Sequence, residues 1–93
     1  MSAKYGWVVT RDCLESKDVR VSGPRAIPHS LLARLLRGEG RKFRLYDDDD
    51  ICYYHGSMLG EYSGFEPLDD YGMPNAGCTW IALMGRNGTW ERL

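Results

Sequence analysis

The stretch RKFRLYDDDDICYYHGSMLGEY, residues 41–62, decides the fold. In its first part apolar and polar residues alternate, so that Phe43 and Leu45 face one side of a strand while Lys42 and Arg44 face the other. The rest of the stretch is aromatic and apolar and is predicted as the antiparallel partner strand, with the four aspartates as the connection. The centre of the fold is therefore expected to be a two-stranded hairpin.

An amphipathic helix is predicted immediately before this hairpin. Pro28 suits the first helical position, and Gly38 suits the position just after the last turn. Between them, four leucines at positions 31, 32, 35 and 36 form one apolar stripe. A helix of only about ten residues needs to pack on a sheet to be stable.

Two further segments complete the expected sheet. Residues 5–13, YGWVVTRDC, predict a first strand with Trp7 and Val9 on one face, and residues 78–93 predict a terminal hairpin that turns at GRNG. We therefore expect one α+β domain over residues 1–93, with a curved antiparallel sheet of about five strands packed by one amphipathic helix. The expected order is one strand, the helix and then four strands, and a sheet that curls into a small barrel is the alternative.

Residues 64–77, GFEPLDDYGMPNAG, are predicted as a long irregular loop, a kind of segment that is often functional in small domains. The loop contains Phe65, Leu68, Tyr71 and Met73, apolar residues that a purely solvated loop would not need. Either these residues fold back over the sheet edge, or they form a recognition surface. The sequence leaves both alternatives open.

Composition and charge exclude some classes of protein. The chain is 43% hydrophobic and 27% charged, as in ordinary soluble globular proteins. No run approaches the roughly 18 apolar residues that span a bilayer, and the first residues lack an apolar signal segment, so we expect a cytoplasmic protein without membrane association.

The charge is distributed unevenly along the chain. Residues 1–46 carry ten basic and four acidic residues, a net charge of +6, whereas residues 47–93 carry nine acidic and two basic residues, a net charge of −7. If the halves segregate in space, opposite faces of two copies attract one another weakly. We therefore expect a monomer or a weak homodimer.

The four consecutive aspartates, residues 47–50, are predicted to form a turn with surplus charge. A calcium loop of the EF-hand type is excluded by its spacing. Counted from Asp47, the fifth, sixth and twelfth positions require an oxygen ligand, glycine and glutamate, but they are Ile51, Cys52 and Met58.

The three cysteines do not form a recognisable metal or redox motif. Cys13, Cys52 and Cys78 are widely spaced, without a CxxC pair, and are predicted to be reduced, mostly buried thiols. A zinc site built from them and His55 lacks the usual close ligand pairs, so we expect no metal and no cofactor. On a regular strand Cys52 and His55 point to opposite faces, which argues against a cysteine–histidine nucleophile. We expect no enzyme, and a small enzyme or metal-binding protein is the second alternative.

A basic region around the helix and the following strand supports a different alternative, nucleic-acid binding. Basic side chains contact phosphates, and the tyrosines nearby could stack on bases. No known nucleic-acid-binding motif is present. The residues of this patch are Arg25, Arg34, Arg37, Arg41, Lys42 and Arg44.

The blocks FRLYDDDD (residues 43–50), CYYHG (residues 52–56) and GFEPLDDYGMPNAGCTWI (residues 64–81) carry a resemblance. Over residues 23–93 the chain resembles a group of small uncharacterised bacterial proteins that are often found near phage or plasmid genes. The group often has glycine after the third aspartate, where this chain has Asp50. The resemblance implies a shared fold and a mobile-element origin, and it implies no activity.

Together these observations favour a small non-catalytic protein-interaction module. An acidic rim and an aromatic-rich loop suit a partner protein with a basic surface, and an inhibitor or adaptor of phage or plasmid type, such as an anti-CRISPR protein, is the analogy. The candidate interaction residues are Asp47, Asp48, Asp49, Asp50, Phe65, Asp69, Asp70, Tyr71 and Met73.

Overall fold

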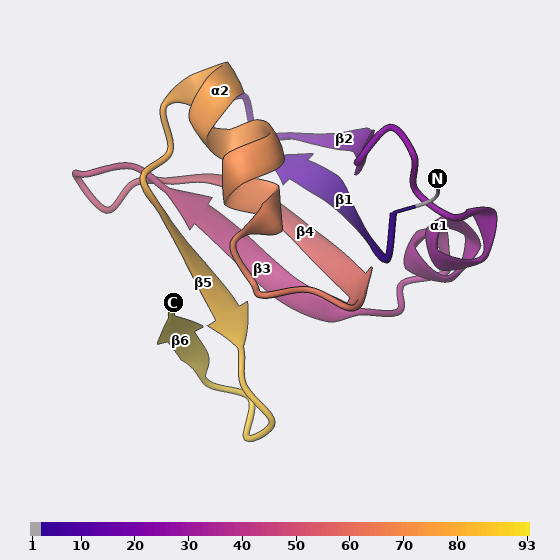
Figure 1. The fold of residues 1–93 in the computed structure, drawn as a ribbon. Helices are drawn as coiled ribbons and strands as arrows, with labels where there is room; N and C mark the ends of the chain where they lie inside the picture. The colour runs from indigo at the N-terminus through magenta and orange to yellow at the C-terminus, as the bar shows by residue number, and fades with distance from the viewer. Residues whose placement is uncertain (1–2) are drawn as a thin grey trace.

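The computed structural model describes residues 3–93, which form an α+β domain. Within these residues six strands make one antiparallel sheet in the order β2-β1-β4-β3-β5-β6 (Figure 1). The strands are β1 (Tyr5–Asp12), β2 (Lys17–Gly23), β3 (Arg41–Tyr46), β4 (Cys52–Gly60), β5 (Trp80–Met84) and β6 (Trp90–Arg92). The helical elements are α1 (His29–Leu36), the π-helical turn η1 (Leu68–Gly72) and α2 (Met73–Ala76).

The predicted fold class and antiparallel sheet are confirmed, but the sheet has one strand more than expected. The additional strand, β2, pairs with β1, and Val9 lies opposite Val21 in that register. Val19 and Val21 pack against the core, while Arg20 between them is exposed. The sheet stays open, with β2 and β6 at its two edges, so the alternative of a small barrel is wrong.

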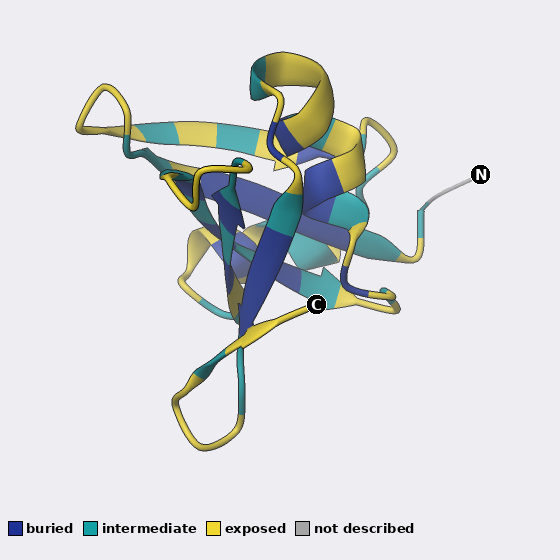
Figure 2. Ribbon diagram, turned by 90° about the vertical axis from the view of Figure 1, so that its left-hand side faces the viewer, coloured by how far each residue is buried: buried dark blue, intermediate teal, exposed yellow. Residues whose placement is uncertain are grey.

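The core lies between one face of the sheet and the segment that contains η1 and α2. Phe43 and Leu45 are fully buried there, as their alternation predicted, and Trp7 and Val9 lie in the same cluster. Burying an apolar side chain of this size contributes about 1.5–3 kcal/mol. Figure 2 shows the buried residues concentrated in the central strands, whereas the turns around the rim are exposed.

Helix α1 lies against β1 and β4 at one end of the other face of the sheet. Of its four leucines only Leu35 is fully buried, and Leu36 is 44% exposed. The helix ends as expected, since Gly38 has a φ of 91°, a left-handed conformation that suits glycine. None of the helices in residues 3–93 has the length and apolar character required to cross a membrane.

The prediction of an irregular loop over residues 64–77 is wrong, because most of this segment is helical. Its beginning is capped by Glu66, whose carboxylate accepts the backbone N–H groups of Ser63 and Gly64, each at 2.8 Å. Its end is Gly77, whose φ is 72° and whose N–H donates to the carbonyl of Met73 at 3.0 Å. We call residues 63–77 the helical segment.

The middle of the helical segment is a π-helical turn. The N–H of Met73 donates to the carbonyl of Leu68, five residues earlier. The next residue, Pro74, has no N–H to donate, so the ordinary α-helical ladder is interrupted at this point. Single π-turns inside helices are frequent at functional sites.

Candidate functional site

The four aspartates form a tightly hydrogen-bonded turn between β3 and β4. The Asp47 carboxylate accepts the backbone N–H groups of Asp49 at 2.9 Å and Ile51 at 3.0 Å. The carbonyl of Asp47 accepts the indole N–H of Trp80 at 3.0 Å. The bond from Ile51 makes the largest contribution to lowering the pKa of Asp47. Asp47 is thus part of the framework of the turn.

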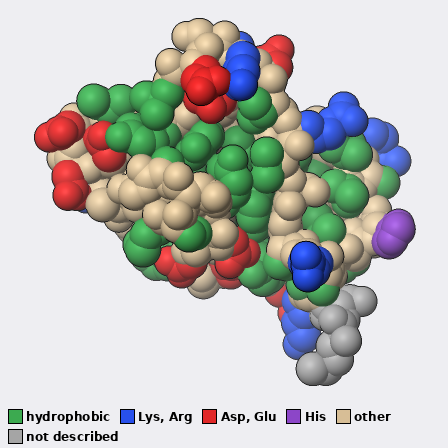
Figure 3. Space-filling view, turned by 90° about the horizontal axis from the view of Figure 1, so that it is seen from above, with side chains coloured by type: hydrophobic (Ala, Val, Ile, Leu, Met, Phe, Trp, Pro, Cys, Tyr) green, Lys and Arg blue, Asp and Glu red, His purple; other side chains and the backbone are tan. Residues whose placement is uncertain are grey.

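The carboxylates of the other three aspartates take no part in these hydrogen bonds. Asp48, Asp49 and Asp50 are exposed, and none has a cationic partner within the described residues 3–93. Asp50 has a φ of 61°, a left-handed conformation that aspartate tolerates better than most residues. Ile51, beside them, is 49% exposed. Figure 3 shows acidic side chains at the end of the molecule where this turn lies and basic ones at the opposite end, near α1.

The second aspartate pair consists of one residue that makes long-range hydrogen bonds and one that does not. Asp70 Oδ2 accepts the hydroxyl of Tyr5 and the indole N–H of Trp7, each at 2.9 Å. Burial, followed by the hydrogen bond to Asp70, raises the pKa of Tyr5 to about 12. Both aspartates are exposed, but Asp70 fastens the helical segment to β1, whereas the Asp69 carboxylate has no hydrogen bond within residues 3–93.

Tyr71 belongs to the structural side of the segment. Its ring lies between those of Trp7 and Tyr54, with centroid distances of 5.5 Å and 5.1 Å. Leu68 is buried in the same cluster. For these two residues the structure shows the first of the two alternatives, in which the segment folds back over the sheet.

The outer side of the helical segment carries a different set of residues. Phe65 is 43% exposed and Met73 is 50% exposed, with Asp69 between them in sequence. The N–H of Asp69 donates to the Phe65 carbonyl at 2.9 Å, so Phe65 and Asp69 are neighbours on the surface of one helical turn. We call Phe65, Asp69 and Met73 the helical ridge. The segment therefore both covers the sheet and displays an apolar and acidic surface.

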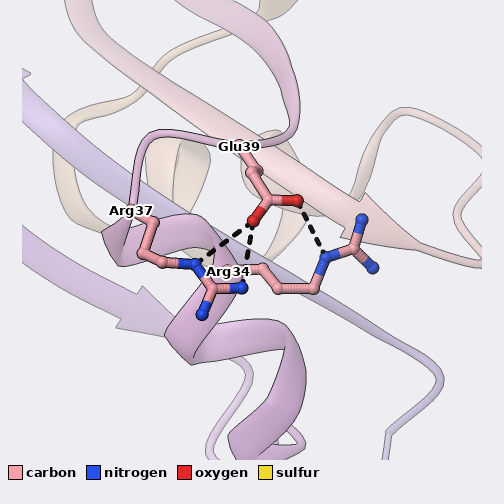
Figure 4. A network of polar contacts seen from close by, with 3 residues as sticks. All are labelled: Arg34, Arg37 and Glu39. Carbon is pink, nitrogen blue, oxygen red and sulfur yellow. Dashed lines mark hydrogen bonds and ion pairs between the residues drawn. The ribbon is translucent and has the colours of Figure 1, made fainter.

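The predicted basic patch is divided by the fold. Arg34 and Arg37 both contact Glu39, with N–O distances of 3.0 Å and 3.1 Å (Figure 4). The hydrogen bond from Arg34, and then that from Arg37, lowers the pKa of Glu39. Arg41 donates to the Met84 carbonyl at 2.8 Å and lies 3.7 Å from a carboxylate oxygen of Glu91.

The remaining cations of the patch lie elsewhere. Arg25 is exposed in the connection between β2 and α1. Lys42 and Arg44 lie on the sheet face opposite the core, and neither has an acidic partner within residues 3–93. The structure thus does not bring the six basic residues together.

Lys42 and Arg44 line a groove of about 310 Å³ on this open face. The guanidinium of Arg44 lies 4.1 Å from the ring centroid of Trp90, a cation–π contact. Burial, with Arg44 next, lowers the pKa of His55, so this groove residue is neutral at pH 7. The groove has two cations and two hydroxyl groups in its polar lining, which is Thr10, Lys42, Arg44, His55 and Ser57.

A larger depression, of about 770 Å³, lies beside the β5–β6 hairpin. Arg41 and Glu91 line it and pair with each other. Arg86 also lines it and has no acidic partner within residues 3–93.

The expectation that Cys52 and His55 point to opposite faces is wrong. In the register of β3 with β4, Leu45 pairs with Tyr54 and Tyr46 pairs with Cys52, so Tyr53 is an extra residue. Such a bulge shifts the alternation by one position and places Cys52 on the face of His55. Burial, followed by the neighbouring Cys13, raises the pKa of the Cys52 thiol to about 12.

Comparison with known proteins finds no matching family model, no matching curated protein and no matching solved structure. Function therefore has to be inferred from the chemistry of the surfaces described above.

Proposed function

We propose that this chain is a non-catalytic protein-interaction module that binds a basic protein surface through the helical ridge and the acidic turn. The observation that carries the proposal is the ridge itself, where two exposed apolar side chains flank a carboxylate on a segment held firmly to the sheet. Single exposed apolar residues are ordinary, but Phe65 and Met73 are both exposed on the one helical segment. Aromatic residues and methionine are enriched in protein interfaces.

The rigidity of the ridge supports a role in binding. Glu66 caps the first turn of the helical segment, and Asp70 hydrogen-bonds the middle of the segment to Tyr5 and Trp7. A surface that is already ordered loses little conformational entropy when a partner docks. Phe65 and Met73 are then the expected anchor residues.

The charge of the surface indicates the kind of partner. Asp48, Asp49 and Asp50 are held on a fixed backbone without neutralising cations among the described residues. Unpaired carboxylates of this kind steer a basic partner toward the site and speed its association. A phage- or plasmid-type inhibitor or adaptor, acting in the cytoplasm, fits this description and the resemblance noted above.

The state of the cysteines supports a non-catalytic role. A reactive cysteine needs a lowered pKa, whereas burial raises that of Cys52. His55 beside it is neutral and has cations, not a carboxylate, as its charged neighbours. This pair lacks the activation that a cysteine nucleophile requires.

Capture of host proteins on the immobilised chain, quantified by mass spectrometry and followed by direct binding of the captured protein, tests the proposal. The double variant Phe65→Ser/Met73→Ser should weaken binding at least tenfold, because buried anchors dominate interface energies. The matched control is Leu36→Ser, on α1, whose side chain is 44% exposed. Binding that survives the double variant, or that Leu36→Ser weakens equally, contradicts the proposal.

A second candidate, nucleic-acid binding, is favoured by the groove with its unpaired Lys42 and Arg44. It ranks lower because the aromatic faces nearby are already occupied. Arg44 covers Trp90, and Tyr46 stacks on Trp80 at a centroid distance of 4.1 Å. We expect no binding tighter than about 10 μM to mixed oligonucleotides near physiological salt, as measured by fluorescence anisotropy. Sub-micromolar binding that is lost in Lys42→Glu/Arg44→Glu would reverse this ranking.

A further inference from the structure

Three metal-ligating side chains meet beside the groove that His55 lines. The Sγ atoms of Cys13 and Cys52 and one ring nitrogen of His55 all lie within 4.8 Å of one another. Cys13 begins the turn after β1, and Cys52 is the first residue of β4. The cluster thus joins residues that are 39 positions apart in the chain.

The backbone brings these side chains together through two irregularities in the sheet. In β4, the extra residue Tyr53 turns Cys52 to the face of His55. In β1, the register with β4 shifts between Val9 and Arg11. The N–H of Cys13 donates to the carbonyl of Tyr53 at 2.9 Å, which fixes the end of β1 against the bulge. Bulges commonly re-aim side chains next to functional sites.

The spacing of the donor atoms is close to that of a zinc site. With Zn–S bonds of about 2.3 Å and tetrahedral angles, two cysteine sulfurs lie about 3.8 Å apart. The Cys13 and Cys52 sulfurs are 4.0 Å apart. Only small side-chain movements are needed for both sulfurs and the imidazole to reach one ion.

We propose that Cys13, Cys52 and His55 bind one Zn²⁺ ion whose fourth coordination position faces the groove that His55 lines. This inference is independent of the ridge and the acidic turn, and it goes beyond the protein-interaction function. Two soft sulfur ligands and an imidazole favour zinc over magnesium or calcium, which prefer oxygen ligands. Three protein ligands with an open fourth position are typical of zinc sites that bind water or a further ligand.

The charges around the cluster are compatible with the ion. Each thiol releases its proton to solvent as its Zn–S bond forms, so the ion and two thiolates together are neutral. Arg11 and Arg44 are the cations nearest His55, and a neutral complex is not repelled by them.

Titration of the reduced, metal-free chain with Co²⁺ alone tests the site, because cobalt reports tetrahedral thiolate ligation by its absorption spectrum. We expect one equivalent to bind, with sulfur-to-cobalt charge-transfer bands and strong visible bands that an equivalent of Zn²⁺ removes. Cys13→Ser and Cys52→Ser should abolish the charge-transfer bands, and His55→Gln should weaken binding at least tenfold.

Two matched controls separate the site from the rest of the chain. Cys78→Ala removes the cysteine outside the cluster, and His29→Gln removes the other histidine. Both should bind Co²⁺ like the unmodified chain, and circular dichroism checks that every variant is folded. The proposal is overturned if excess Co²⁺ produces no thiolate bands in the folded chain, if the bands persist in Cys13→Ser and Cys52→Ser, or if they are lost in Cys78→Ala while the fold is retained.

Discussion

The acidic turn and the helical segment both contain adjacent aspartates, yet they use them in different ways. In the turn, Asp47 bonds to the N–H groups of Asp49 and Ile51, so every contact of its carboxylate is local. In the helical segment, Asp70 bonds to Tyr5 and Trp7, which are 65 and 63 residues away in the chain. The first aspartate shapes its own backbone, and the second connects distant parts of the fold. Similar sequence patterns thus have local or long-range roles that only the tertiary structure distinguishes.

The largest test of this comparison is Asp70→Ala. The substitution leaves the Tyr5 hydroxyl and the Trp7 indole N–H without their shared acceptor, and hydrogen bonds to charged groups contribute about 1.5–3 kcal/mol each. Because the Tyr5 bond is exposed, we expect a total loss of about 2–3 kcal/mol, or a fall in Tm of roughly 10–20 °C. Urea and thermal denaturation measure both quantities.

Asp69→Ala is the control for that experiment. Asp69 is adjacent in sequence and exposed, so its loss should change stability by less than about 0.5 kcal/mol. Equal effects of the two substitutions would contradict the structural role of Asp70.

A smaller effect is expected for Asp47→Ala in the turn. The substitution removes the acceptor of two backbone N–H groups, but water can replace it because the turn is exposed. We expect a loss of stability less than half that of Asp70→Ala, whereas Asp48→Ala should be neutral or slightly stabilising because it relieves repulsion between like charges. Chemical denaturation of Asp70→Ala, Asp47→Ala and Asp48→Ala under identical conditions measures the three changes in unfolding free energy. A loss of stability in Asp48→Ala as large as that in Asp47→Ala would contradict the expected order.

The smallest effect concerns the pH dependence of stability, in which both regions contribute on the acid side and only the contact of the helical segment with β1 contributes on the alkaline side. Asp47 and Glu66 have pKa values lowered in the folded chain, where backbone N–H groups from Ile51 and Ser63 favour their charged forms. Their contribution is present above the unfolded pKa of about 4 and is lost as the pH falls through the folded values. On the alkaline side the pKa of Tyr5 is raised to about 12, so its contribution is present below about 10 and is lost as the pH rises through 12.

Ultraviolet titration of tyrosinate checks the alkaline limb. Asp70→Asn should lower the pKa of Tyr5 only in part, because burial is the larger cause of its shift. Asp47→Asn should leave Tyr5 unchanged. If Tyr5 titrates in Asp70→Asn as it does in the unmodified chain, then Asp70 has no electrostatic effect on Tyr5, contrary to this prediction.

Local patterns predicted the sheet well. The alternation around Phe43 and Leu45 gave the correct buried face, because side chains on a regular strand point alternately to opposite sides. Strand β2 was missing from the expected sheet because it is an edge strand with one face in solvent. Only Val19 and Val21 indicate in the sequence that its other face packs against the core. The start of the helical segment was readable, since Ser63 and Glu66 have the spacing of a capping box.

The candidate sites were harder to predict, for two physical reasons. Which aspartate is structural depends on Tyr5 and Trp7, and no pattern near Asp70 identifies partners at the other end of the chain. The Cys52 and His55 side chains share a face only because Tyr53 is an extra residue in the ladder, and one sequence does not reveal a bulge. Cys52 and His55 are three residues apart in the sequence, and on a regular strand that spacing places their side chains on opposite faces.

The compact turn at Asp47 also has a consequence for the order in which the chain folds. The β3–β4 hairpin joins neighbouring residues, and isolated hairpins form in roughly 1–10 μs. The pairing of β1 with β4 instead brings Trp7 beside Met58 and has to close a loop of most of the chain, which costs more entropy. We therefore expect the aspartate turn to nucleate the hairpin first. Strand β1 and the Asp70 contact then assemble late, so Asp70→Ala should accelerate unfolding while leaving the folding rate nearly unchanged.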